Sequence, residues 1–319
     1  MSKLGRVSET LSDNFDEDLL LQEPISVWRR TFKRLLSRRS GKIGLFLIGF
    51  IFLIAFTAPI IAPYDPNEVL IGKEIVKLKK REGPCIHMLG CDSAKPQHIM
   101  GIDGNYRDQF SRIIYGSRIS LSIGFSTVSF AVTGGVLLGA LAAFFGGWID
   151  NIIMRMMDVI LGFPSLLLAI AIVAVLGPGI RNALFAIAIV TLPAYARLTR
   201  ASVLSVKELD FVKASIALGA SPTRLLLFRI LPNSLTPVVV LSTLGIATAI
   251  LDAAGLSFLG LGAQPPTPEW GTMLGSERNQ VFSAPHLVFF PGIAIMITVL
   301  AFNLFGDGLR DALDPRLND

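Results

Sequence analysis

Six long apolar stretches, separated by polar segments, dominate the pattern of this chain. About 20 apolar residues in a helix cross the hydrocarbon core of a bilayer, whereas a membrane β-barrel would show short alternating segments. The pattern therefore predicts an all-α, polytopic membrane protein with six transmembrane helices. The predicted spans cover residues 43–61, 119–145, 152–176, 180–198, 235–256 and 287–305.

Composition and charge agree with this class and suggest an orientation. Charged residues make up 17% of the 319 residues, against about 25% in a typical soluble domain. The net charge of +5 is too modest to indicate a nucleic-acid partner. Seven Lys and Arg residues lie between residues 29 and 42, before the first span, and such residues favour the cytoplasmic side. We therefore expect both termini in the cytoplasm, although basic residues at 73–81 in the first loop argue the other way.

This topology divides the chain into five parts. They are a cytoplasmic tail (1–42), the first transmembrane helix (43–62), an extracytoplasmic loop (63–117), a five-helix transmembrane core (118–306) and a second cytoplasmic tail (307–319). The core includes a polar, basic cytoplasmic segment, residues 207–232, that is longer than a turn between two spans needs to be.

Segment 207–232 has the pattern of two short helices. We expect the first to end at Gly219, where the chain bends. Ser221 suits the N-cap of the second helix and Pro222 its first position, and Pro232 is expected to stop that helix. The segment holds more apolar residues than a connector in water needs. It is therefore either an amphipathic helix on the bilayer surface or a rigid element that docks into a soluble partner.

Charged residues inside the predicted spans include Asp252, Arg155 and Asp158. Asp252 lies near the outer end of the fifth span, where a carboxylate costs less to insert than the roughly 2.5–3.5 kcal/mol of a central position. It is either a gate or pathway residue or a structural carboxylate hydrogen-bonded to a neighbouring loop. Arg155 and Asp158 are three positions apart in the third span, so they share a helix face. They form either a local ion pair or a substrate contact.

Glycine and proline add two further pairs of alternatives. Gly135 and Gly139 in the second span favour either close helix packing or a pathway-lining face. Pro164 and Pro193 are expected to kink or open the third and fourth spans, either beside a cavity or simply as part of bundle packing.

Chelating and nucleotide-binding motifs are few. Cys85, His87, Cys91 and His98 lie close together in the first loop. They predict a disulfide between the two cysteines, free thiols, or a metal site. The sequence around Gly41 and Lys42 lacks the glycine and the Ser or Thr of a phosphate loop. If this chain moves a solute uphill, the energy must come from a partner or an ion gradient.

Segment 207–232 resembles the EAA loop of ATP-binding cassette (ABC) importer permeases. The resemblance rests on Ala214, on Gly219 and on the terminal Leu231-Pro232. The usual Glu-Ala-Ala opening is Lys-Ala-Ser here, so the family's acid is missing, and Asp210 or Glu208 is the nearest acid that could replace it. The resemblance implies the following ATPase-coupling residues: Asp210, Lys213, Ala214, Ser215, Gly219, Ala220, Leu231 and Pro232.

Other segments are similar to the peptide/nickel branch of this family, in particular to the second, "C"-type permease of dipeptide and oligopeptide importers. The similarity extends from about residue 28 to the end of the chain. Residues 74–97 look like an insertion. The matching segments are 62–66, 101–118, 256–271, which reads LSFLGLGAQPPTPEWG, and 306–317.

The resemblance implies the fold of a type I ABC importer permease and a place in the plasma (inner) membrane. It implies a homologous second permease, two ATPase subunits that bind ATP and Mg, and an extracytoplasmic solute-binding protein, with no cofactor, metal or catalytic residue in this chain. The loops 63–117 and 257–286 would face the binding protein. The candidate gate or pathway residues are Asp158, Asp252 and Ser257.

The implied function is import of di- or oligopeptides. Nickel complexes and glutathione are alternatives within the family. A proton-driven secondary transporter, a membrane enzyme and a channel are alternatives of other classes. Each is disfavoured, since the sequence shows few intramembrane acids, no catalytic constellation and no filter-like loop.

Overall fold

The computed structural model describes residues 27–74 and 78–313, and these residues form helices and isolated β-bridges but no strand. The predicted all-α class is confirmed. Within the described residues, five single helices are long and apolar enough to cross a membrane. They are α3 (Arg39–Ile61), α4 (Gln109–Phe145), α7 (Ile180–Lys207), α11 (Thr236–Phe258) and α13 (His286–Leu313).

The third predicted span is wrong as a single helix. Its residues form α5 (Gly147–Leu161) and α6 (Ser165–Leu176), which are bent by 92° relative to each other. The break falls at Gly162 to Pro164, because Pro164 lacks an N–H and disfavours helix in the residue before it. The pair counts as a sixth crossing only if it is taken as one broken span. Pro193, in contrast, lies buried inside the continuous helix α7.

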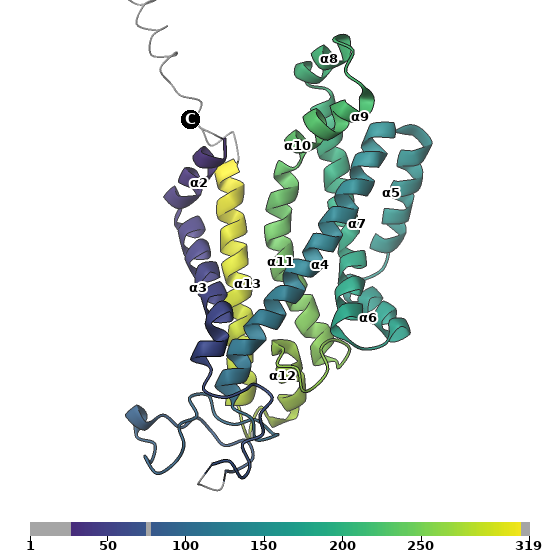
Figure 1. Ribbon diagram of the computed structural model, residues 1–319. Coiled ribbons are helices and arrows are strands. Elements are labelled where there is room, and N and C mark those ends of the chain that lie inside the picture. Colours follow the sequence, from purple (N-terminus) through teal and green to yellow (C-terminus); the bar gives the residue numbers. More distant parts are fainter. Residues whose placement is uncertain (1–26, 75–77, 314–319) are drawn as a thin grey trace, which may run out of the picture.

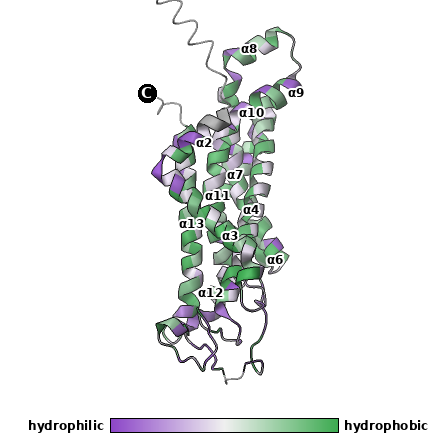
Figure 2. Cartoon of the chain, turned by 60° about the vertical axis from the view of Figure 1, so that its left-hand side comes forward, coloured by the Kyte–Doolittle hydropathy of each residue, from purple (hydrophilic) through white to green (hydrophobic). Residues whose placement is uncertain are grey.

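The helices run roughly alongside one another, with polar segments at both ends (Figures 1 and 2). Helix α2 (Val27–Ser37), the end of α13 and the helices that follow α7 lie at one end. The loop between α3 and α4 lies at the opposite end, together with α12 (Trp270–Glu277) (Figure 1). Helix α2, the end of α13 and segment 207–232 therefore lie at the same end of the helices, while residues 1–26 and 314–319 of the predicted tails lie outside the described residues.

Helix α4 packs closely on α7 through its small residues. A Cβ atom on Gly135 would lie 2.5 Å from Cβ of Tyr195, and one on Gly139 would overlap the carbonyl oxygen of Ala196. Separations this short exclude any side chain, so the close approach of the two helices requires glycine at both positions. The packing interpretation of this glycine pair is confirmed.

Helix α3 exposes a row of large apolar side chains, with Phe46, Phe56 and Ile60 at 71%, 86% and 84% exposure. Its opposite face packs against α13, partly through Gly44, where a Cβ would overlap the backbone of Phe305. The exposed face suits lipid or another membrane chain, since such a surface in water would be an aggregation hazard.

Candidate functional site

Segment 207–232 folds into a projection of short helices beyond the end of α7 (Figure 1). Helix α8 (Asp210–Ala217) is followed by α9 (Pro222–Leu225), the π-helical turn η2 (Leu226–Ile230) and α10 (Leu231–Ser234). Gly219 lies between α8 and α9 with φ +79°, in the left-handed region. Residues with a Cβ rarely adopt this conformation. The predicted bend at Gly219 therefore has a backbone cause.

The second half of the segment differs from the prediction in two respects. Pro222 occupies the start of α9 as expected, but the side chain of Ser221 makes no capping hydrogen bond. Pro232 does not stop the helix, because it lies at the start of α10, directly after η2. A π turn widens the helix by one residue, and a new helical turn can then begin where the missing N–H of proline costs little.

The base of the projection is anchored in the protein. Val212, Leu225 and Ile230 are at most 5% exposed and pack with residues at the ends of α4 and α7. Lys207 donates from Nζ to the carbonyl oxygens of Ala143 and Phe144 at 3.3 Å, which are among the last of α4. A cation is favourable at this end of a helix, where carbonyl groups are unpaired. A movement of α8 and α9 would thus be passed on to α4 and α7.

The outer face of the projection is apolar. Leu218, Phe228 and Ile216 are 89%, 72% and 57% exposed. Lys213 and Glu208 form an exposed ion pair at 3.7 Å, so the Glu208 carboxylate already has a basic neighbour. Asp210 lies at the first position of α8, where a negative charge is favourable.

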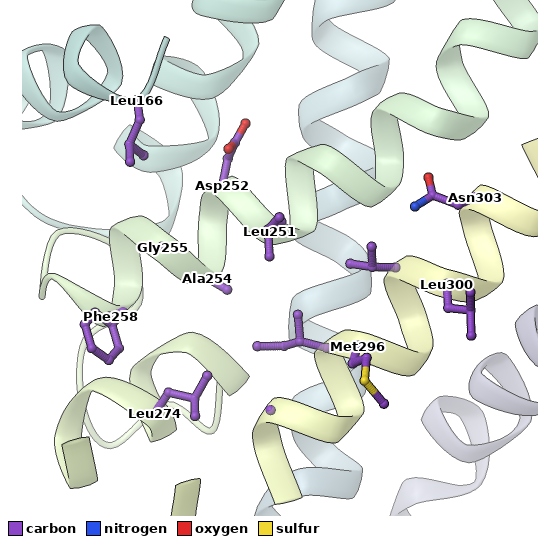
Figure 3. Close-up of a pocket in the computed structure, with 13 residues that line it drawn as sticks. Leu166, Leu251, Asp252, Ala254, Gly255, Phe258, Leu274, Met296, Leu300 and Asn303 are labelled. Atoms are coloured by element: carbon purple, nitrogen blue, oxygen red, sulfur yellow. The ribbon is translucent and has the colours of Figure 1, made fainter. Parts of the chain in front are cut away.

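A groove of about 820 Å³ opens along α11 and α13, with contributions from α6 and α12 (Figure 3). Its walls are almost entirely apolar. Asp252 on α11 and Asn303 on α13 are the polar side chains among its lining residues. Within the described part of the chain, neither side chain has a hydrogen bond or an ion pair, so Asp252 is not bonded to a neighbouring loop in this chain.

The two other candidate pathway residues lie elsewhere. Asp158 does not pair with Arg155, because the structure gives it an ion pair with Arg197 of α7. The prediction of a local pair within one helix is therefore wrong: the long Arg197 side chain reaches Asp158 from the neighbouring helix. Ser257 is buried, and its Oγ accepts a hydrogen bond from the Ala263 N–H at 3.2 Å. It holds the turn after α11 and does not line the groove.

The loop between α3 and α4 contains a disulfide between Cys85 and Cys91. No group of three or more His, Cys, Asp or Glu residues is arranged to hold a metal ion in residues 27–74 and 78–313. The metal-site interpretation of the two cysteines, His87 and His98 is therefore not supported.

His98 holds this loop to the ends of two helices. Its Nδ1 lies 2.8 Å from Asp108, which caps the start of α4, and its Nε2 lies 3.3 Å from Glu74. Its ring stacks on Tyr64, which directly follows the α3 region and donates to Glu74 at 2.9 Å. Burial lowers the pKa of His98, but the hydrogen bonds and charges of Asp108 and Glu74 outweigh it, so the pKa is raised from its usual value near 6.5.

The raised pKa of His98 predicts a pH-dependent stability. The folded protein binds this proton more tightly than the unfolded chain does. Protonated His98 therefore stabilises the fold fully below about pH 6.5, the pKa of histidine in the unfolded chain. This stabilisation is lost as the pH rises through the folded pKa. In detergent, the melting temperature of wild type should be higher than that of His98→Gln, and this difference should be larger at pH 5.5 than at pH 9. A difference that does not change with pH would contradict protonation of this histidine.

The block at residues 256–271 contains residues whose role the sequence did not indicate. Glu269 is 1% exposed and caps α12, accepting from the N–H groups of Gly271 and Thr272 at 2.9 and 2.8 Å. Trp270 donates from Nε1 to the carbonyl oxygen of Ile113 in α4 at 3.0 Å. A Cβ on Gly271 would lie 2.5 Å from the backbone of α11. The Glu-Trp-Gly sequence thus fixes α12, one wall of the groove, against α4 and α11.

A bundle of helices long enough to span a membrane, with a projecting pair of short helices at one end, is an arrangement that fits a membrane transport subunit. The chain belongs to the family described as "binding-protein-dependent transport system inner membrane component", whose model matches residues 135–319. Residues 26–79 match a second model, "N-terminal TM domain of oligopeptide transport permease C". It is therefore a multi-pass inner-membrane permease subunit, as the sequence predicted.

Characterised relatives cover nearly the whole chain. It is 46% identical to the dipeptide transport system permease protein DppC of Alkalihalophilus pseudofirmus over 92% of this chain and 91% of the relative. It is 45% identical to the di/tripeptide permease DppC of Pseudomonas aeruginosa, over 95% and 96%. It is 44% identical to the glutathione transport system permease protein GsiD of Pectobacterium atrosepticum, over 91% and 90%.

A solved structure supports the fold. A chain of the MetNI methionine ABC transporter in an inward-facing conformation superposes with a TM-score of 0.53 at 18% sequence identity. The match covers 64% of this chain and 97% of that one. The predicted ABC importer permease fold is confirmed.

Proposed function

We propose that this chain is one of two permease subunits of an ATP-driven importer of di- and oligopeptides. The observation that carries the proposal is the projection at residues 207–232. It has a fixed bend at Gly219, a base buried against α4 and α7, and an apolar outer face. An anchored element of this kind can transmit the rigid-body motion of a soluble partner to the spans.

The ATPase subunits, which bind ATP and Mg, are the proposed partner of the projection. Leu218 and Phe228 would enter a groove on an ATPase, the usual way in which a helix binds through its apolar face. Closure of the ATPase pair on ATP would then move the inner ends of α4 and α7. Lys213 of α8 stands where the family has an acid, and it forms an exposed ion pair with Glu208, which follows α7.

Di- and oligopeptides are proposed as cargo because the relatives at 45–46% identity carry dipeptide or di/tripeptide names. Glutathione is the second candidate, favoured by the relative of that name at 44% identity. An extracytoplasmic binding protein would deliver the cargo to the loop between α3 and α4 and to α12, and a homologous permease would complete the translocation path.

The test is reconstitution of the complete complex in proteoliposomes with its own binding protein. A dipeptide, a longer peptide and glutathione are supplied in turn, and ATP hydrolysis and uptake are measured. ATP-dependent uptake of a peptide supports the proposal. Uptake that follows a proton gradient without ATP would instead identify a secondary transporter.

The disulfide tests the proposed orientation, in which both termini and the projection are cytoplasmic. After mild reduction, a membrane-impermeant thiol reagent should label Cys85 and Cys91 in intact cells. The same reagent added outside inverted vesicles, whose outer face is the cytoplasmic side of the membrane, should not label them. A Cys85→Ser, Cys91→Ser variant provides the background, and labelling from the cytoplasmic side would overturn the topology.

A further inference from the structure

The groove along α11 and α13 offers one carboxylate on an otherwise apolar surface. Leu166, Leu251, Phe258 and Leu274 are among its walls, and Asp252 is the acidic residue that lines it. In Figure 3, Asp252 comes from α11 and Asn303 from α13, and the Asp252 carboxylate extends on the side of α11 where Leu166 lies. A volume of about 820 Å³ falls within the range of small-molecule sites, roughly 300–1,000 Å³.

Asp252 lacks a partner within the described part of the chain. Two acids of α5 have ion pairs with α7: Asp150 accepts from Arg200 at 2.5 Å, and Asp158 pairs with Arg197. A carboxylate at the centre of a spanning helix costs about 2.5–3.5 kcal/mol on insertion scales, and this cost is lower toward the end of the span, where Asp252 lies. No described residue pairs with Asp252, which leaves its carboxylate free to bind a group that is not part of the described residues.

The chemistry of the site selects that group. A carboxylate among apolar side chains favours a cation with N–H donors and an apolar remainder. A peptide has such a group at its amino end, where the α-ammonium is positive. Its carboxyl end is negative and would be repelled by Asp252. We propose that Asp252 binds the α-ammonium group of the peptide during passage, with the leucine and phenylalanine walls contacting its first side chain. This inference rests on the proposed function.

The main alternative is that a basic residue of the second permease pairs with Asp252. Labelling of the path separates the two. Two dipeptides carry the same photoreactive leucine analogue, one in the first position and one in the second. Each is supplied with binding protein to the complete complex, which is trapped with vanadate and irradiated, and labelled residues are mapped by mass spectrometry. The first-position probe should label α11 near Leu251 or α6 near Leu166, and the second-position probe should not.

Variants complete the test. Asp252→Asn should abolish the difference between the two probes and lower peptide uptake per ATP hydrolysed by about tenfold, the effect of losing a hydrogen bond between charged groups. Asp252→Glu should restore both. Asp307→Asn makes the same change on α13 outside the groove lining and should behave as wild type.

The outcomes are distinct. Equal labelling by both probes in wild type, or unchanged uptake by Asp252→Asn, would overturn the role of Asp252 while leaving the importer intact. Loss of the second permease from the purified Asp252→Asn complex would show an interface pair and would also overturn it. If the wild-type complex hydrolysed ATP but imported neither dipeptide, the proposed function itself would fail.

Discussion

Replacing Gly219 by valine is expected to reduce ATP-coupled uptake at least about tenfold while the complex still assembles. The φ angle of +79° at this residue costs an ordinary L-residue about 1–2 kcal/mol, and a β-branched side chain is the least tolerant of it. No atom lies within 4 Å of a Cβ built at this position. The backbone would therefore change and not the packing, and α8 would no longer be held at its angle to α9.

The measurements are uptake and ATP hydrolysis in the same proteoliposomes. Loss of uptake with continued hydrolysis, or loss of stimulation by the loaded binding protein, is the expected signature of uncoupling. Gly219→Asn should retain more activity than Gly219→Ala, because asparagine tolerates the left-handed region. That order would not be expected if the size of the side chain were the cause.

Two further variants serve as controls for the Gly219 experiment. Gly49→Val lies in α3, where the glycine has neither a positive φ nor an atom within 4 Å of a Cβ, and it should keep coupling. Lys213→Glu should have a smaller effect than Gly219→Val, because Lys213 forms only an exposed pair with Glu208. Coupling at the wild-type level in Gly219→Val would remove the basis of the proposed transmission.

The spans were predictable because hydrophobic length follows directly from bilayer thickness. Five predicted spans correspond to α3, α4, α7, α11 and α13, although several helices extend beyond the apolar stretch. The third predicted span is wrong because an apolar pattern indicates how many consecutive residues avoid water, but not whether they form one straight helix. Pro164 was recognised as a kink, but the 92° angle depends on how α5 and α6 pack on α7.

The candidate site was predictable where its cause is local. The bend at Gly219 comes from a backbone conformation that glycine favours, so the residue type indicates it. The partner of Asp158 was not predictable, because Arg197 reaches it from a different helix. The course of the chain through Pro232 also escaped prediction, since it depends on the wider turn at η2.

The Glu-Trp-Gly sequence shows the same limit most clearly. Its contacts join segments that are far apart in the chain: Glu269 lies 3.4 Å from the Ser120 hydroxyl, and the Trp270 indole donates to the carbonyl oxygen of Ile113. Such distances in sequence cannot be read from a motif. Once the contacts are known, they show Glu269 to be a buried acid whose substitution should be costly.

Glu269→Ala is expected to destabilise the protein by about 3 kcal/mol. The substitution removes the cap of α12 and leaves the N–H groups of Gly271 and Thr272 buried without acceptors. It also opens a gap beside Ser120. The free energy of unfolding is measured by titration of the purified permease from dodecyl maltoside into sodium dodecyl sulfate.

The series of Glu269 variants separates the cap from the charge. Glu269→Gln keeps one carbonyl acceptor and should lose less stability than Glu269→Ala. Glu68→Ala removes an acid of the exposed Lys73 pair and should change the free energy by less than about 0.5 kcal/mol, since surface ion pairs contribute little. If Glu269→Ala had the same free energy of unfolding as the wild type, α12 would be held by its apolar contacts alone. In that case Trp270→Phe, which removes part of the buried apolar contact of Trp270 as well as its hydrogen bond to Ile113, should destabilise the protein more than Glu269→Ala.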